Sequence, residues 1–227
     1  MVAVGTAHHL MQRAAAHRTV FETDSDCLVY LSLLRQYSRL DGLRILAYCL
    51  MPDHVHLVAV PERADSMARA LSKAHGLYSA YLNTRQCRAG PLWQARYYSC
   101  PLDAAHVWVA LRYVERNPVR ASLAAQPAAY PWSSAAVHCG DSAADALLDL
   151  PLFRRCWNGL FWSRFLACDE ADGGEAFEIW HATRAGRPLG CPEFVKALER
   201  MLDRPLLPLH RERLRRCLFA QSAATLL

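Results

Sequence analysis

The segment LRILAYCLMPDHVHLVAVP, residues 43–61, gives the clearest indication of how this chain folds. Two apolar runs, Leu43 to Leu50 and Val55 to Val60, flank the turn Met51-Pro52-Asp53, and this pattern is typical of a hairpin of buried strands. Pro61 ends the second strand because a proline cannot donate to the ladder of a sheet. The sequence therefore predicts a buried antiparallel pair here.

The elements on both sides of this hairpin complete a known order. We predict a strand at 7–13, a helix from Asp24 or Ser25 to Arg39, a helix from Asp65-Ser66 to Arg85, a strand from Leu92 to Cys100, and a helix that Asp103 caps and that ends before Pro118. The order β-α-β-β-α-β plus a helix is the ferredoxin-like split βαβ pattern. It predicts an α+β fold whose antiparallel four-stranded sheet carries two helices on one face. The other face is left for a ligand or the added helix.

The second part of the chain reads as a helical extension. A small, polar stretch from Ser133 to Ser142 suggests a boundary between a domain at 1–137 and an extension at 141–227. Helices are expected near 143–148, 154–167, 175–181, 192–202 and 209–220. The last of these carries four arginines, so it is either a solvated basic helix or a surface for DNA.

Composition narrows the class of protein. Apolar residues make up 53% of the 227 and charged residues 21%, which suits a globular core. The longest apolar run is too short to span a membrane, and the first residues lack the pattern of a signal peptide. The nine cysteines form no C-x-x-C pair, which argues against zinc ribbons and disulfide frameworks. We expect a soluble cytoplasmic protein with reduced, mostly buried thiols.

The basic charge is concentrated in the first part of the chain. Residues 1–140 carry fourteen Arg or Lys against nine Asp or Glu, whereas residues 141–227 carry twelve of each. Arginine forks suit phosphate oxygens, so this excess favours a nucleic-acid partner. Within it, aromatic and cationic residues around Trp93 are suited to stacking on unpaired bases, although a strand with one aromatic face in the core fits equally well. The candidate DNA contacts are Arg85, Arg88, Trp93, Arg96, Arg112, Arg116 and Arg120.

Two histidines on the second hairpin strand form the first candidate site. His54 and His56 project from the same face of a strand, with Cα atoms about 6–7 Å apart, so both rings can bind one divalent ion. An H-x-H tripeptide alone is more often an ordinary pair of surface or core histidines. Its place on a buried strand favours the metal site, because imidazoles buried without partners are costly.

The second candidate site lies on the helix that follows Asp103. Tyr113 and Asn117 are four residues apart and share a helix face. Asn117 stands just before the helix-ending proline, where its amide could reach a metal ion. The alternatives are an amphipathic core residue for Tyr113 and a helix cap for Asn117.

Four segments together resemble a known family. PDHVHL, LWQARYY, RYVERNPVRA and YPWSS occur in this order, at similar spacing, in the REP-associated tyrosine transposases, which are single-tyrosine HUH endonucleases. The likeness covers about residues 7–136. It implies a ferredoxin-like transposase that uses Mg²⁺ or Mn²⁺ to cut single-stranded DNA beside a hairpin, with no nucleotide cofactor and no membrane. We expect this protein to act as a monomer or a homodimer.

The resemblance also implies roles for single residues. His54 and His56 match the metal ligands, Tyr113 matches the nucleophile that forms a 5′-phosphotyrosine, and Asn117 stands where related transposases have glutamine. Tyr97 and Tyr98 are weaker rivals for the nucleophile. The chain departs from the usual pattern at Ser122, where relatives have glycine and where a positive φ would strain serine, and at Ala14, which replaces a strand glycine.

Other functions remain open from the sequence. A domesticated protein could bind hairpin DNA or RNA without cutting it. A nuclease could use a metal-bound water, in which case Tyr113 would be dispensable. A structural ferredoxin-like module would need neither histidine. The DNA target is not readable from the sequence.

Overall fold

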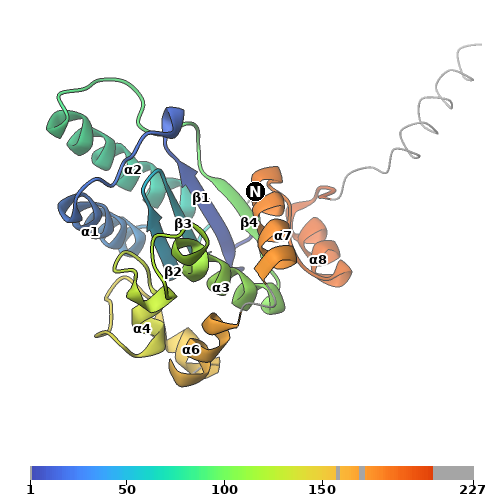
Figure 1. Ribbon diagram of the computed structural model, residues 1–227. Coiled ribbons are helices and arrows are strands. Elements are labelled where there is room, and N and C mark those ends of the chain that lie inside the picture. Colours follow the sequence, from blue (N-terminus) through green and yellow to red (C-terminus); the bar gives the residue numbers. More distant parts are fainter. Residues whose placement is uncertain (1, 157–158, 169–171, 207–227) are drawn as a thin grey trace, which may run out of the picture.

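A four-stranded antiparallel sheet forms the centre of the computed structural model (Figure 1), which describes residues 2–156, 159–168 and 172–206. The strands lie in the order β2-β3-β1-β4. Their bounds are β1 (His8–Arg13), β2 (Leu43–Met51), β3 (His54–Pro61) and β4 (Tyr98–Pro101). Every pairing is antiparallel, with β1 between β3 and the edge strand β4. This is the ferredoxin-like sheet predicted from the hairpin outward, so the predicted fold class is confirmed.

Helices α1 (Asp24–Leu40) and α2 (Ser66–Arg85) cover one face of the sheet. Alternate strand residues such as Leu10 and Leu57 meet the tyrosines of these helices, Tyr30 and Tyr78, in one buried cluster. The cap of α1 is Thr23, one residue before the first predicted cap, Asp24. The Thr23 side chain accepts a hydrogen bond from the amide of Asp26, and the Asp26 carboxylate accepts one from the amide of Thr23, which forms a capping box. The short 3₁₀ turn η1 (Ala15–His17) links β1 to this layer.

Helix α3 (Ala104–Arg120) covers the opposite face, where the sequence left room for it. The Asp103 side chain caps its start, as predicted. Its end was predicted wrongly, because the helix continues through Pro118 to Arg120. A proline this close to the helix end removes one backbone bond, and the amides of Ala121 and Leu123 still bond to the carbonyls of Asn117 and Pro118.

Strand β4 is shorter than the predicted strand at 92–100. It begins at Tyr98, and the residues before it form an irregular segment with a single bridge between Ala14 and Trp93. Leu92 is buried and Trp93 is partly buried against the α1–α2 core. Packing into that core, and not pairing with β1, determines the path of this segment.

The C-terminal part is helical, as expected, but its elements differ in detail. It contains η2 (Pro127–Ala129), α4 (Ala135–Cys139), α5 (Leu150–Cys156), α6 (Gly159–Ala167), α7 (Asp172–Ala185) and α8 (Pro192–Leu202). The helix predicted at 143–148 is wrong: this segment turns, and Leu148 forms a parallel bridge with Ile45. The basic helix predicted at 209–220 lies outside the described residues.

The extension packs directly on the sheet. Helix α7 lies beside β4, and contacts β1 and α3 (Figure 1). The boundary near residue 140 stays a prediction, although Ser134 already hydrogen-bonds to the backbone of Tyr48 in β2. None of the helices in the described ranges combines the length and the apolar character needed to cross a membrane.

Candidate DNA-cleavage site

The two histidines of β3 lie together on the face of the sheet that α3 covers. The ring centroids of His54 and His56 are 4.8 Å apart, with the rings nearly perpendicular. His56 is 2% exposed, and the side chain of His54 is 14% exposed. The period of a strand places them on one face, as the sequence predicted.

Each ring is held through its Nδ1 atom. In His54 this atom lies 2.5 Å from Oδ1 of Asp53, whose other oxygen is 3.7 Å from the Arg13 guanidinium. In His56 it lies 3.0 Å from Nε2 of His9, a residue of β1. Neither bond uses the Nε2 atoms of His54 and His56, and no residue in the described part of the chain hydrogen-bonds to them. Metal-binding histidines are oriented in this way, with one nitrogen on an outer partner and the other on the ion.

The histidines are electrostatically suited to a cation. Burial lowers the pKa of both histidines and carries that of His56 well below its usual range, while the hydrogen bond that His54 donates to the Asp53 carboxylate partly restores the pKa of His54. Neutral imidazole is the form that binds metal ions. Within the described residues, no group of three His, Cys, Asp or Glu side chains is placed to hold a metal. A third ligand would therefore be another kind of group, such as an amide oxygen, a phosphate or water.

Tyr113 meets this pair from α3. Its ring stands edge-on to the rings of His9 and His56, with centroids 5.4 Å away in both cases. The guanidinium of Arg120 lies over the Tyr113 ring, 4.4 Å from its centroid. Burial raises the pKa of the Tyr113 hydroxyl, while the Arg120 charge and a hydrogen bond from Asn117 act in the opposite direction.

Asn117 lies one helical turn after Tyr113. Its Nδ2 donates to the Tyr113 carbonyl at 3.0 Å, and Arg120 donates to the same carbonyl at 2.7 Å. Asn117 is therefore inside the helix and is not the cap that its position before Pro118 suggested. Its side-chain oxygen is not used in that bond, which keeps it available as a ligand.

Two of the predicted DNA contacts are buried, which corrects the sequence-based prediction. Arg112 and Arg116 are 2% and 4% exposed. Arg112 donates to the carbonyls of Phe165 and Cys168, and Arg116 donates to that of Leu166. These guanidinium groups hold the C-terminal carbonyls of α6, as cations do at helix ends, and do not face solvent.

The remaining predicted contacts lie in different places. Arg85 is engaged in ion pairs with Glu22 and Asp26, at the far end of α2 from Ser66. Arg88 is exposed in the loop that follows. Trp93 donates its indole N–H to the backbone carbonyl of His75, and its ring packs against the His75 imidazole. Of the seven predicted contacts, Arg120 is the one beside Tyr113.

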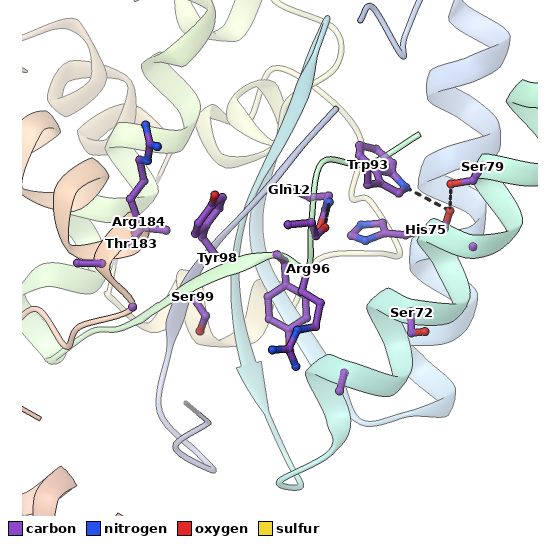
Figure 2. A pocket seen from close by; sticks show the side chains of 16 residues that line it. Gln12, Ser72, His75, Ser79, Trp93, Arg96, Tyr98, Ser99, Thr183 and Arg184 are labelled. Carbon is purple, nitrogen blue, oxygen red and sulfur yellow. Dashed lines mark hydrogen bonds between the residues drawn. The ribbon is translucent and has the colours of Figure 1, made fainter. Parts of the chain in front are cut away.

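A pocket of about 920 Å³ surrounds the edge strand β4 (Figure 2). Its walls come from β1, α2, the segment before β4, and the end of α7, and the side chains labelled there include Gln12, Ser72, His75, Ser79, Trp93, Arg96, Tyr98, Ser99, Thr183 and Arg184. A smaller hollow shares Tyr98 and Arg184 with it and reaches Arg13 and His17. Both of these residues lie 3.7 Å from Asp53, the partner of His54.

Sequence reasoning missed several members of this region. His9, Asp53, Thr183 and Arg184 were not singled out. His9 stood on a predicted strand, and Asp53 directly precedes His54, so each offered a weak signal. Nothing in the sequence pairs His9 with Thr183, which lies 174 residues away.

Comparison with known proteins identifies the family. Residues 3–117 match the sequence profile of the IS200-like transposases, a span that includes His54, His56, Tyr113 and Asn117. No curated protein matches significantly in sequence.

One solved structure shares the fold of this chain. The chain is similar to a REP-associated tyrosine transposase bound to a REP hairpin, with a TM-score of 0.53, 18% identity, and coverage of 64% of this chain and 90% of that one. A crystal structure from Deinococcus radiodurans R1 described as a transposase aligns less well, with a TM-score of 0.35, 18% identity, and coverage of 52% and 84%. The chain belongs to the family of IS200-like transposases.

Proposed function

We propose that this transposase is a metal-dependent endonuclease and strand transferase for single-stranded DNA, with Tyr113 as its nucleophile. The observation that carries the proposal is the meeting of three groups on one face of the sheet. Tyr113 lies edge-on to His56, the His pair presents two free Nε2 atoms, and Arg120 covers the tyrosine ring. A nucleophile, a cation site and a positive charge are the parts that attack on a phosphodiester requires.

The proposed reaction is a transesterification. The Tyr113 oxygen forms a bond to phosphorus as the bond from phosphorus to the 3′ oxygen breaks. The tyrosine proton is lost and the departing oxygen gains one, leaving a 5′-phosphotyrosine and a free 3′-OH. Because the phosphodiester energy is kept, the 3′-OH of another strand can reverse the step without ATP.

The chain's own residues account for binding and charge. His54, His56 and Asn117 would hold Mg²⁺ or Mn²⁺, which polarises the scissile phosphate when bound. Arg120, over the Tyr113 ring, stabilises the phenolate as it forms and offsets the burial that raises the pKa of this hydroxyl. Asn117 and Arg120 both donate to the Tyr113 carbonyl, and these bonds fix the last turn of α3.

The pocket around β4 suits the single strand that leads away from the cleaved bond. It offers an aromatic surface in Trp93 and Tyr98, and positive charge in Arg96 and Arg184. Stacking on aromatic rings and contact with phosphates is how proteins hold unpaired bases. The hollow beside Arg13 connects this pocket with the neighbourhood of Asp53 and His54. We therefore propose Arg96, Trp93 and Arg184 as strand contacts, and hairpin DNA as the partner.

A covalent-adduct assay tests the proposal. The protein is mixed with labelled single-stranded hairpin DNA from the flanks of its own gene and Mn²⁺, and run on a denaturing gel. We expect a band that resists SDS, is absent with chelator, and is lost in Tyr113→Phe. Tyr37→Phe, on the helix layer of the opposite face, is the matched control and keeps the band.

Other outcomes would support a different function. Hairpin binding without any adduct in the wild type would favour a protein that binds DNA and no longer cuts. Cleavage that persists in Tyr113→Phe would favour a metal-bound water. Loss of the adduct in Tyr97→Phe or Tyr98→Phe, with Tyr113→Phe active, would move the nucleophile to the segment around the start of β4.

A further inference from the structure

A line of buried hydrogen bonds connects His56 with the C-terminal extension. His56 Nδ1 is 3.0 Å from His9 Nε2, and the other nitrogen of His9 is 2.7 Å from the hydroxyl of Thr183 in α7. All three side chains are nearly inaccessible, with exposures of 2%, 0% and 1% in that order.

A hydroxyl can both donate and accept, so the Thr183 oxygen can accept from Nδ1–H of His9. This is the direction that the proposed metal site requires, because a cation bound at Nε2 of neutral His56 leaves the His56 proton on Nδ1. With its single proton on Nδ1, neutral His9 accepts at Nε2 from Nδ1–H of His56.

We infer that Thr183 is a positioning residue, which acts through His9 to keep the proton of His56 on Nδ1 and the lone pair of Nε2 free for the metal ion. The inference rests on the proposed metal site and adds a residue to it. In the opposite tautomer Nε2 of His56 would carry the proton and could not bind a cation. Outer partners that fix the tautomer of a ligand contribute about 10–100-fold to metal affinity.

The same geometry means that the extension takes part in forming the site. Helix α7 contacts β1, β4 and α3, and Thr183 is the residue by which it reaches the histidines. Residues 3–117, which match the family profile, do not include it. Thr183 thus supplies from outside that span an acceptor that the histidines need.

The test uses the full-length protein and two measurements that do not depend on DNA cleavage. Mn²⁺ affinity is measured by calorimetry, and the tautomer of His56 in the metal-free protein is read from ¹⁵N chemical shifts, assigned with His56→Gln. The variants are Thr183→Val, which keeps the shape and removes the hydroxyl, and Thr183→Ser, which keeps the hydroxyl. Thr84→Val, on the exposed surface of α2, is the control.

We expect His56 to carry its proton on Nδ1 in the wild type and a mixture of tautomers in Thr183→Val. Mn²⁺ affinity should fall about 10–100-fold in Thr183→Val, and stay within about threefold of wild type in Thr183→Ser and Thr84→Val. Wild-type His56 protonated on Nε2 would overturn the inference, even if Thr183→Val does not fold. So would a folded Thr183→Val with unchanged tautomer and affinity.

The tautomer also separates this inference from the proposed function. If the wild type binds no Mn²⁺ but His56 shows the expected tautomer and loses it in Thr183→Val, the metal site is wrong and the positioning role is supported. If Mn²⁺ binds tightly and Thr183→Val binds it equally well, the metal site is supported and the positioning role is wrong.

Discussion

Two buried polar clusters lie against helix α3, and they differ in what they leave open. The histidine cluster contains His9, His54 and His56 and meets Tyr113. The glutamate cluster contains Glu115, whose carboxylate is 2.5 Å from Ser134 Oγ, 2.5 Å from His138 Nδ1 and 2.7 Å from Trp162 Nε1. In the glutamate cluster three donors converge on a fully buried acceptor. In the histidine cluster, the Nε2 atoms of His54 and His56 have no hydrogen bond to any described residue.

The difference separates the two roles that buried polar groups have in this protein. The glutamate cluster joins α3 to α4 and α6, because its donors come from those segments or from just before them. The Nε2 atom of His138 is buried and has no hydrogen-bond partner among the described residues. The Glu115 carboxylate, which accepts from three donors, contributes to stability, whereas the open Nε2 atoms of His54 and His56 on β3 are suited to a ligand.

The largest effect should come from opening the glutamate cluster. Glu115→Ala leaves three buried donors without an acceptor, and we expect the free energy of unfolding to fall by about 3–5 kcal/mol. Urea denaturation followed by circular dichroism measures it. Glu178→Ala, at an exposed position on α7, should change the free energy by less than about 0.5 kcal/mol. A Glu115→Ala protein as stable as wild type would mean that the cluster is not structural.

Removing a proposed metal ligand from the histidine cluster should reduce metal affinity strongly and stability only moderately. In His54→Ala we expect Mn²⁺ affinity to fall by at least about 100-fold, the upper end of the loss seen for outer partners. Stability should fall less than in Glu115→Ala, because the change removes one mostly buried ring and one hydrogen bond to Asp53 and leaves no group of three buried donors without an acceptor. Calorimetric titration with Mn²⁺ measures the first effect and urea denaturation the second. A metal affinity that survives would remove His54 from the site.

The buried histidines should make the fold sensitive to acid. Burial lowers the pKa of His8 to about 4 and those of His9 and His75 to about 3, whereas the unfolded chain binds these protons near pH 6.5. The unfolded state therefore takes up more protons as the pH falls, so stability is lost below about pH 6.5 and continues to fall toward these lower values. Each group contributes about 1 kcal/mol per pH unit in that window.

Substituting single histidines shows whether the acid sensitivity comes from buried histidines in general or from the histidine cluster alone. His9→Gln and His75→Gln should each make the fall in stability with acid shallower by one group, although these residues lie on opposite faces of the sheet. Urea midpoints between pH 7.5 and 5.0 supply the comparison. If His9→Gln alone changes the slope, the acid sensitivity belongs to the histidine cluster and not to burial in general.

These predictions also show what the sequence could and could not reveal. The period of a strand places His54 and His56 on one face, and the period of a helix places Tyr113 near Asn117, so local rules were sufficient for both pairs. Local rules failed at Pro118, where the backbone tolerates a proline in a last turn, and at Leu92, where packing into the helix layer overrides strand propensity.

Contacts between distant segments were beyond the sequence. The sequence predicted that Arg112 and Arg116 lie at the surface. In the structure helix α6 covers them, and their guanidinium groups donate hydrogen bonds to its C-terminal carbonyls. His9 and Thr183 meet because α7 packs on β1, and no pattern within either segment indicates this. Charge and spacing predicted the kind of site, and tertiary packing decided which cations face it.

A smaller effect is expected from the cation over the nucleophile. Arg120→Met removes the charge above the Tyr113 ring, an interaction of up to about 2 kcal/mol, so adduct formation should slow by up to about thirtyfold. Arg120→Lys keeps the charge but not the planar stack, and we expect an intermediate rate. Single-turnover kinetics of adduct formation on the hairpin substrate measures both. An unchanged rate in Arg120→Met would leave the Tyr113 phenolate without the stabilisation proposed here.

The smallest effect concerns Ser122, two residues after Arg120. This serine has a φ of 56°, in the left-handed region where a glycine would bear no strain. Ser122→Gly should therefore stabilise the fold by about 0.5–1 kcal/mol, because the strain relieved exceeds the cost of a more flexible unfolded chain. Thermal denaturation measures this change. If stability rises and the rate of adduct formation is unchanged, the strain is incidental. If stability rises while the rate of adduct formation falls, the strained backbone at the end of α3 helps to hold Arg120 over Tyr113. The histidine cluster and Tyr113 would then depend on backbone strain, whereas the glutamate cluster would not.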